Sequence, residues 1–166
     1  MLIFQVVGYK KTGKTTLVCR LVERFRQEGL QVATIKHDAH GFEPDVPETD
    51  SWKHRRSGAS MTAVVSAERT AFFEERGAEL EELVARMSNA DVIVIEGFKH
   101  GPYPKMALIH SEDHLELLGT LSSCIGIVTW NDRLAAQTDA GIQVLDFTDI
   151  ESITDAIRNR ATLPPL

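Results

Sequence analysis

The sequence has few cysteines, no long apolar run and no excess of positive charge. Its 166 residues include two cysteines, Cys19 and Cys124, which do not form a C-x-x-C pair. This excludes a disulfide framework and favours a reducing compartment. No apolar run approaches the roughly 20 residues that a membrane helix needs, so we expect no membrane association. The formal net charge of -6 argues against a general nucleic-acid binder, which would carry a broad basic patch.

The beginning of the chain reads as a strand. The first seven residues, MLIFQVV, lack both a basic region and a small-residue cleavage site, so they do not resemble a secretory signal. We therefore expect a cytoplasmic protein. The length favours one domain over residues 1–166, and a content of 43% hydrophobic and 25% charged residues is typical of a globular protein.

Strand-like and helix-like segments alternate along most of the chain. Apolar residues of 14–28 recur on one helical face, and we place Cys19 near that face. Strands are expected at 2–7, 31–35, 61–66, 69–73, 91–96, 106–109, 124–129 and 143–147, and helices at 14–28, 50–56, 77–87 and 150–159. The strands at 61–66 and 69–73 are candidates for pairing with each other. This alternation predicts an α/β three-layer fold with a mainly parallel sheet.

A phosphate-binding loop joins the first strand to the first helix. Residues 8–15 read GYKKTGKT, in which Gly8 and Gly13 let the backbone amides turn toward phosphate oxygens. Lys14 supplies a cation for the β- and γ-phosphates, and the hydroxyl of Thr15 can ligate Mg²⁺. The helix that follows points its positive end at the same anion. The pattern and its place predict a P-loop nucleotide-binding protein.

A carboxylate at the end of a neighbouring strand would complete such a site. The run DVIVIEG at 91–97 is the most strand-like segment of the chain, and Glu96 stands at its end. We therefore expect Glu96 to serve the metal through water or to position an attacking water. A glutamate simply solvated at a strand end is the alternative.

Polar loops after other strands are expected to line the same crevice, because ligands of open α/β sheets bind at the carboxyl ends of the strands. His37 follows the second strand, and with His40 it forms an H-x-x-H pair, a weak zinc pattern or a polar loop. Asn131 and Asp132 suit recognition of a nucleotide base, with Asp132 accepting from a guanine amino group, although the full N-K-x-D motif is absent. Asp50 is a candidate for a supporting acid. Arg55 and Arg56 form either an anion-binding cluster or a solvated helix face. A basic loop with Lys99, His100 and Lys105 is expected to face a substrate or a partner.

Several of these motifs together resemble the molybdopterin-guanine dinucleotide biosynthesis protein B family (MobB). They are GYKKTGKTT at 8–16, IKHDAH at 35–40, DS at 50–51, RRSGA at 55–59 and VIEGFKH at 94–100. The match keeps order and spacing from residue 2 to about residue 100 and is looser beyond. The bulky, basic first half of the P-loop departs from the small residues often found there, so Lys10 or Lys11 either adds phosphate contacts or faces solvent.

The resemblance implies an accessory protein of molybdenum cofactor maturation that binds GTP with Mg²⁺, hydrolyses it weakly at most and forms a homodimer. Its implied partner is the guanylyltransferase that attaches GMP to molybdopterin, and direct contact with molybdopterin is left open. Carried over, the phosphates would be held by Gly8, Lys11, Thr12, Gly13, Lys14, Thr15 and Thr16, the metal by Thr15 and Glu96, and catalysis would rest on Lys14 and Glu96. His37, Asp50 and Lys99 fall in family motifs without a definite role.

Two other functions fit the same residues. A P-loop small-molecule kinase that uses ATP would share the opening strand, loop and helix, and would need an arginine-bearing lid. A non-catalytic adaptor would use the nucleotide to change the loop at 37–47, which a partner would read.

Overall fold

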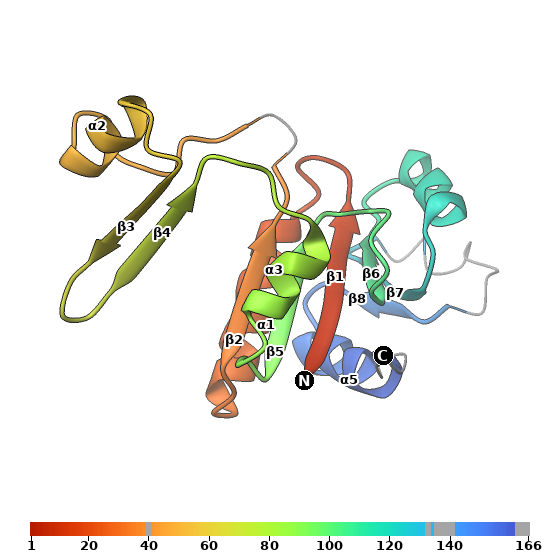
Figure 1. Ribbon diagram of the computed structural model, residues 1–166. Helices are drawn as coiled ribbons and strands as arrows, with labels where there is room; N and C mark the ends of the chain where they lie inside the picture. Colours follow the sequence, from red (N-terminus) through yellow and green to blue (C-terminus); the bar gives the residue numbers. More distant parts are fainter. Residues whose placement is uncertain (39–40, 132–133, 135–141, 162–166) are drawn as a thin grey trace. The chain divides into compact units, whose positions relative to one another are not determined.

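The computed structural model describes residues 1–38, 41–131, 134 and 142–161 (Figure 1). The contacts of the chain divide it into two compact units, Met1–His37 with Val84–Leu166, and Asp38–Leu83. We refer to them as the sheet unit and the inserted unit. The expectation of one P-loop domain over residues 1–166 stays a prediction.

The sheet unit is built around a six-stranded sheet in the order β2-β5-β1-β6-β7-β8, and every pair in it is parallel. Its strands are β1 (Leu2–Gly8), β2 (Val32–Lys36), β5 (Val92–Glu96), β6 (Lys105–Leu108), β7 (Cys124–Thr129) and β8 (Val144–Asp146). The helical elements are α1 (Lys14–Gln27), α5 (Ile150–Arg160) and the 3-10 segment η1 (Glu112–Thr120), while α3 (Leu80–Arg86) spans the boundary of the two units. The predicted α/β three-layer P-loop fold is confirmed.

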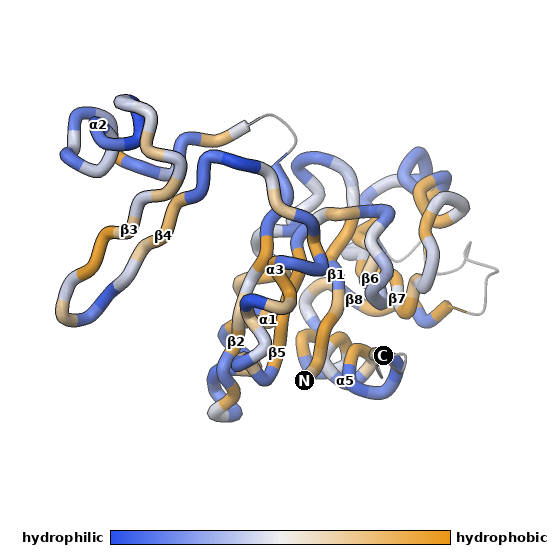
Figure 2. Tube along the Cα trace, viewed as in Figure 1, coloured by the Kyte–Doolittle hydropathy of each residue, from blue (hydrophilic) through white to orange (hydrophobic). Residues whose placement is uncertain are grey.

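The two faces of this sheet are covered by different elements, because successive residues of a strand point to opposite faces. Phe4 and Val6 pack with buried residues of α1 and α5, whereas Val7 packs on the other face with Leu117 of η1. Figure 2 shows hydrophobic colours along β1 and β5, two of the strands that are buried on both faces. Near-continuous apolar strands of this kind are typical of a parallel sheet.

One expectation about α1 was wrong. Leu17 and Leu21 of this helix are fully buried, but Cys19 is exposed. At about 100° per residue, Cys19 lies roughly 130° from the centre of the apolar face. No helical segment was predicted over the residues of η1.

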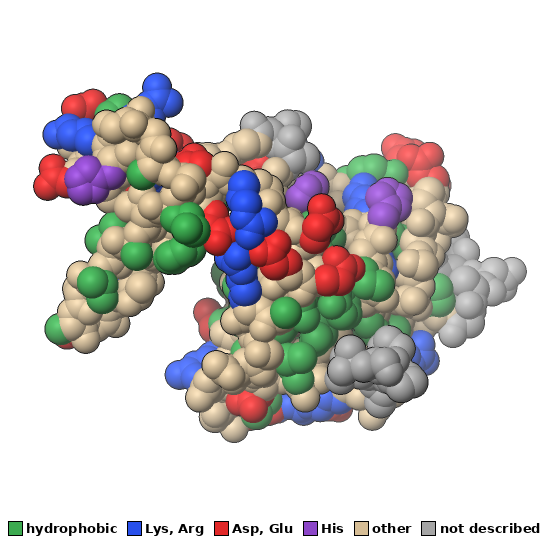
Figure 3. All heavy atoms as spheres, in the orientation of Figure 1, with side chains coloured by type: hydrophobic (Ala, Val, Ile, Leu, Met, Phe, Trp, Pro, Cys, Tyr) green, Lys and Arg blue, Asp and Glu red, His purple; other side chains and the backbone are tan. Residues whose placement is uncertain are grey.

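The inserted unit contains the short helix α2 (Asp50–Arg56) and the strands β3 (Met61–Val65) and β4 (Thr70–Glu74). The two strands form an antiparallel sheet of their own with Met61 opposite Glu74 and Val65 opposite Thr70. Their predicted pairing is therefore confirmed. Met61, Val64, Val65 and Phe72 are exposed, and Figure 3 shows hydrophobic side chains along the surface of this hairpin.

Candidate functional site

The loop between β1 and α1 has the backbone that its two glycines predict. An added Cβ at Gly8 would lie 2.9 Å from Thr12 Oγ1 and 3.0 Å from the carbonyl oxygen of Leu108. Gly13 has a φ of 84° and caps α1 without a side-chain hydrogen bond. No side chain at the cap competes for the first backbone N–H groups of α1, and such groups form an anion-binding site at the start of a helix.

Two side chains of the loop donate to one carbonyl oxygen. Thr12 Oγ1 lies 2.8 Å from the Tyr9 oxygen and Lys14 Nζ lies 2.6 Å from it. Burial lowers the pKa of Lys14; Glu96 opposes this shift, while the positive charges of Lys99 and Lys36 add to it. An anion at the loop would relieve this accumulation of positive charge, so the electrostatics favour phosphate.

Glu96 is brought to the P-loop by strand register. It ends β5, where it lies opposite Val6 of β1 and Lys36 of β2. Its side chain is only 8% exposed, and both carboxylate oxygens accept from Thr15 Oγ1, at 3.0 and 3.2 Å. The two residues predicted to serve a metal are thus in direct contact.

These donors fit Mg²⁺ because Mg²⁺ takes oxygen ligands and keeps several waters alongside one or two carboxylates and phosphates. When bound there, the ion would neutralise charge on the phosphates. Within the described ranges, no cluster of three or more His, Cys, Asp or Glu side chains could hold a metal by itself. A bound nucleotide would therefore supply part of the coordination.

Lys99 also reaches the P-loop. Its Nζ lies 4.2 Å from the centre of the Tyr9 ring, a cation–π distance. The hydroxyl of Tyr9 donates to Glu116 Oε1 at 2.9 Å, and its ring lies 4.7 Å from that of His114. The bulky residue at the second position of the loop therefore joins it to Lys99 and to η1.

Two buried polar residues, Gln5 and Lys105, hold the segment at 97–104, which carries Lys99. Gln5 Nε2 donates to the carbonyls of Gly97 and Phe98 at 3.0 and 2.6 Å. Lys105 Nζ donates to the carbonyls of Gly101, Tyr103 and Ser122 at 2.6, 3.0 and 3.0 Å.

Lys105 is fully buried, and burial lowers the pKa of its ammonium. The expectation that Lys105 faces a substrate or partner is wrong, because its charge is engaged by three backbone carbonyls. Of the predicted basic loop, Lys99 and His100 remain at the surface, half-buried and exposed respectively.

The other predicted residues are less closely tied to the loop. His37 donates its amide to the Glu96 carbonyl at 2.9 Å, and its ring lies 4.7 Å from Phe98. The Asn131 amide donates to Thr129 Oγ1 at 3.1 Å. Lys11 and Thr16 are exposed, whereas Asp132 and His40 lie outside the described residues, so base recognition and the H-x-x-H pair stay predictions.

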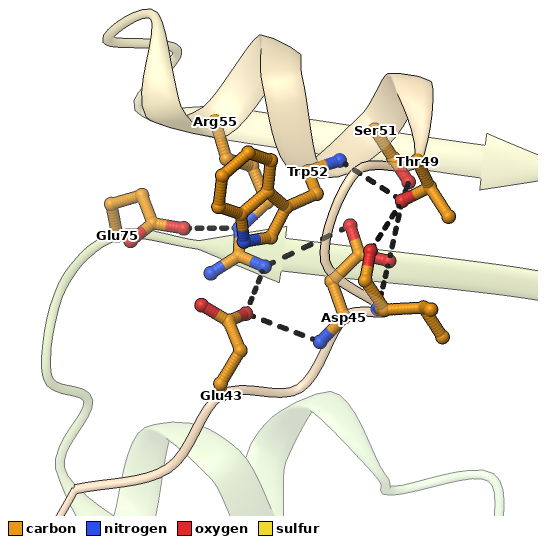
Figure 4. A network of polar contacts seen from close by, with 8 residues as sticks. Glu43, Asp45, Thr49, Ser51, Trp52, Arg55 and Glu75 are labelled. Carbon is orange, nitrogen blue, oxygen red and sulfur yellow. Dashed lines mark hydrogen bonds and ion pairs between the residues drawn. The ribbon is translucent and has the colours of Figure 1, made fainter.

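The inserted unit holds Asp50 and the basic cluster. Asp50 is exposed at the start of α2, and its role as a supporting acid stays a prediction. Figure 4 shows Arg55 surrounded by carboxylates: it pairs with Glu43 at 2.8 Å and with Glu75 at 2.5 Å. Its guanidinium also lies 5.1 Å from the Phe73 ring. Arg55 thus links segments of this unit, which leaves Arg56 as the exposed member of the pair.

Sequence reasoning gave no role to Trp130, which is 42% exposed and lies against the P-loop. An added Cβ at Gly13 would be 3.1 Å from its Cη2. The available signal was its position directly after the buried strand β7, at the sheet edge where ligands bind.

A parallel sheet, a P-loop at the end of β1 and an acid at the end of the adjacent β5 define the P-loop NTPase class. The particular family follows from comparison with known proteins. The family model for molybdopterin guanine dinucleotide synthesis protein B, MobB, matches residues 3–130. The chain belongs to this family, and the resemblance seen in its motifs is confirmed.

Individual relatives agree. The chain is 34% identical over 120 residues to the probable molybdopterin-guanine dinucleotide biosynthesis adapter protein of Bacillus subtilis (strain 168), covering 70% of this chain and 69% of the relative. It is 31% identical over 161 residues to the corresponding adapter protein of Escherichia coli (strain K12), covering 90% and 87%. A crystal structure of Bacillus subtilis MobB superposes with a TM-score of 0.81 at 27% identity, covering 99% of this chain and 100% of that one. Among the described residues, no helix is long and apolar enough to cross a membrane.

Proposed function

We propose that this protein is a GTP-binding adapter of molybdenum cofactor maturation. It binds Mg-GTP in the P-loop, hydrolyses it slowly and assists the guanylyltransferase that makes molybdopterin guanine dinucleotide, in the cytoplasm and as a homodimer. Family membership and the adapter role named for its relatives support the pathway.

The contact between Thr15 and Glu96 is the observation that carries the nucleotide part of this proposal. A hydroxyl and a nearly buried carboxylate meet at 3.0 Å, next to a loop whose lysine has its pKa lowered by burial. A fold that used this loop only as a turn would have no need to bury an acid beside it, because an ionised carboxylate is costly to remove from water. Binding of Mg²⁺ and phosphates accounts for both features.

Slow hydrolysis agrees with how Arg20 is used. Lys14 can stabilise charge on the phosphates and Glu96 can hold a water, but an arginine finger adds about 10³ or more in rate. Arg20, the arginine of α1 nearest to the P-loop in sequence, donates to the carbonyls of Phe147 and Thr148 instead. We therefore expect turnover far below that of an activated GTPase.

The exposed β3–β4 hairpin supports the homodimer. Each of its two strands has one unpaired edge in the described sheet, and Val65 and Phe72 are 75% and 57% exposed. Exposed edges with apolar side chains favour pairing with another chain. A second copy would pair one of these edges with the same edge of its own hairpin about a two-fold axis, and Val65→Lys should then shift the protein toward the monomer in light scattering.

The proposal is tested by equilibrium binding of GTP and ATP, each with and without Mg²⁺. Tight Mg²⁺-dependent binding of GTP with weak binding of ATP is expected, together with co-purification with a guanylyltransferase. Lys14→Ala should abolish binding, whereas Arg26→Ala, which removes a charge at the opposite end of α1, should not. Unchanged binding by Lys14→Ala would overturn the P-loop assignment, and a preference for ATP would favour the small-molecule kinase.

A further inference from the structure

Trp130 is an exposed aromatic side chain at the edge of the sheet that carries the P-loop. It follows Thr129, the last residue of β7, and 42% of it is exposed although the five residues before it are buried. A single exposed aromatic ring is ordinary on a protein surface, so the exposure of Trp130 gains its meaning from where the ring lies. Its position at the carboxyl end of a parallel strand is where ligands of this fold class bind.

The indole lies directly against the phosphate loop. A Cβ added at Gly13 would lie 3.1 and 3.3 Å from Cη2 and Cζ3 of Trp130, so the six-membered ring packs on this glycine. Gly13 immediately precedes Lys14 and starts α1. A nucleotide with its phosphates in the loop would therefore have an aromatic surface within reach on the β7 side.

The ring is held in place by edge contacts. Phe147 meets it at 4.5 Å between centroids and 88°, and His110 meets it at 5.0 Å and 61°. Both angles are far from parallel, so neither neighbour stacks flat on the indole. The surface left for a flat aromatic ligand is the 42% of Trp130 that stays exposed.

The backbone around the ring is also fixed. The Phe147 amide donates to the Thr129 carbonyl at 2.8 Å, and Arg20 donates to the Phe147 and Thr148 carbonyls. The guanidinium of Arg20 lies 5.4 Å from the Phe147 ring. Arg20 of α1 thereby fixes the backbone at Phe147 and Thr148, which supports the indole. The entropy cost of ordering this part of the site on ligand binding is therefore small.

We propose that Trp130 is the stacking platform for the aromatic base of the nucleoside triphosphate. This inference rests on the proposed function. The P-loop accounts for the phosphates of the nucleotide, and Trp130 would account for its base. Every base has a π face, so stacking adds affinity without choosing between guanine and adenine. Trp130 thus contributes to the strength of binding, and the choice of base is left to hydrogen bonds elsewhere.

The experiment compares GTP with inorganic tripolyphosphate, which carries the phosphates without a base. The chain has two tryptophans, so Trp52→Phe leaves Trp130 as the only indole reporter. Both ligands should bind with Mg²⁺, but only GTP should quench the fluorescence of Trp130. Trp130→Ala should weaken GTP roughly 10-fold or more and change the affinity for tripolyphosphate less than about twofold. Trp130→Phe, which keeps an aromatic face, should recover most of the loss.

The outcomes separate the two proposals. Equal losses for both ligands in Trp130→Ala would mean that the indole only supports the P-loop, and unchanged GTP affinity would mean that the base lies elsewhere; either result overturns the stacking role. Failure of the wild-type protein to bind either ligand would instead overturn the nucleotide-binding function. In that assay, Lys14→Ala should lose both ligands together.

Discussion

The hydroxyl of Thr15 and the carboxylate of Glu96 are hydrogen-bonded at 3.0 Å, although 81 residues separate them in the sequence. Thr15 lies in the first turn of α1, and Glu96 ends β5, the strand that pairs with β1 in parallel. A parallel pair puts the end of β5 beside the start of the loop that follows β1. The contact is therefore a product of strand order.

We predict that Glu96→Gln separates metal binding from phosphate binding. The amide keeps the shape and removes the charge that attracts Mg²⁺, so Mg²⁺ affinity in the presence of GTP should fall about 10- to 100-fold. Binding of GTP without Mg²⁺ should be unchanged or stronger, because a negative charge near the phosphates is lost. Titration calorimetry at several Mg²⁺ concentrations measures both, with Glu23→Gln, an exposed residue of α1, as the control. An unaltered Mg²⁺ dependence would remove Glu96 from the metal site.

Gly8→Ala should damage the loop by crowding. The new methyl would lie 2.9 Å from Thr12 Oγ1 and 3.0 Å from the Leu108 carbonyl oxygen, and backbone cannot easily give way. Overpacking of this kind costs about 1–3 kcal/mol of unfolding free energy, and GTP affinity should fall with it. Gly119→Ala is the matched control, since nothing lies within 4 Å of its added Cβ. Urea unfolding with equal midpoints for the two variants would contradict this account.

Lys105→Met should destabilise the sheet unit and loosen the segment that carries Lys99. Methionine fills the space of the buried stem but leaves the carbonyls of Gly101, Tyr103 and Ser122 without their donor. A buried acceptor that loses its partner costs about 1–3 kcal/mol, so the loss of unfolding free energy should be at least of that order. Lys105→Arg keeps a cation and tests whether charge alone suffices. Faster hydrogen exchange at 97–104 is the local readout, and a variant as stable as wild type would show that these bonds contribute nothing net.

The two cysteines should differ in reactivity. Cys19 is exposed, whereas Cys124 is half-buried, and burial raises the pKa of its thiol. Because the thiolate is the reactive form, the native protein should show one fast thiol and one slower by about 10-fold or more at neutral pH. Cys19→Ser should remove the fast phase, and the remaining rate should rise with pH well into the alkaline range.

The raised pKa of the Cys124 thiol also makes the stability of the fold depend on pH. A thiol pKa that is higher in the folded state stabilises the fold below the unfolded-state value, and this contribution is lost as pH rises through the folded-state value. Cys124→Ala should therefore flatten part of the alkaline loss of stability. A thiol in Cys19→Ser that reacts as fast as free cysteine would contradict both expectations.

The sequence by itself determined the P-loop, the apolar strands and the α/β class. Glycines at fixed spacing, a lysine and a hydroxyl before an amphipathic helix are local requirements, and Gly8, Gly13 and Lys14 meet them without help from the rest of the chain. Buried parallel strands can also be recognised in the sequence as continuous apolar runs, and VIVIE at 92–96 is the clearest of them. For the same reason Glu96 could be singled out at the end of its strand.

Only the tertiary structure decided which residues meet. Strand order put β5 between β1 and β2 and so placed Glu96 on Thr15, and packing buried Lys105 under backbone carbonyls that no local pattern identifies. In the sequence, nothing distinguishes Trp130 from any other aromatic residue at the end of a strand, and only its contact with Gly13 gives it a role. Contacts between distant residues are fixed by how sheets and helices pack, and one sequence read along its length does not contain that pairing explicitly.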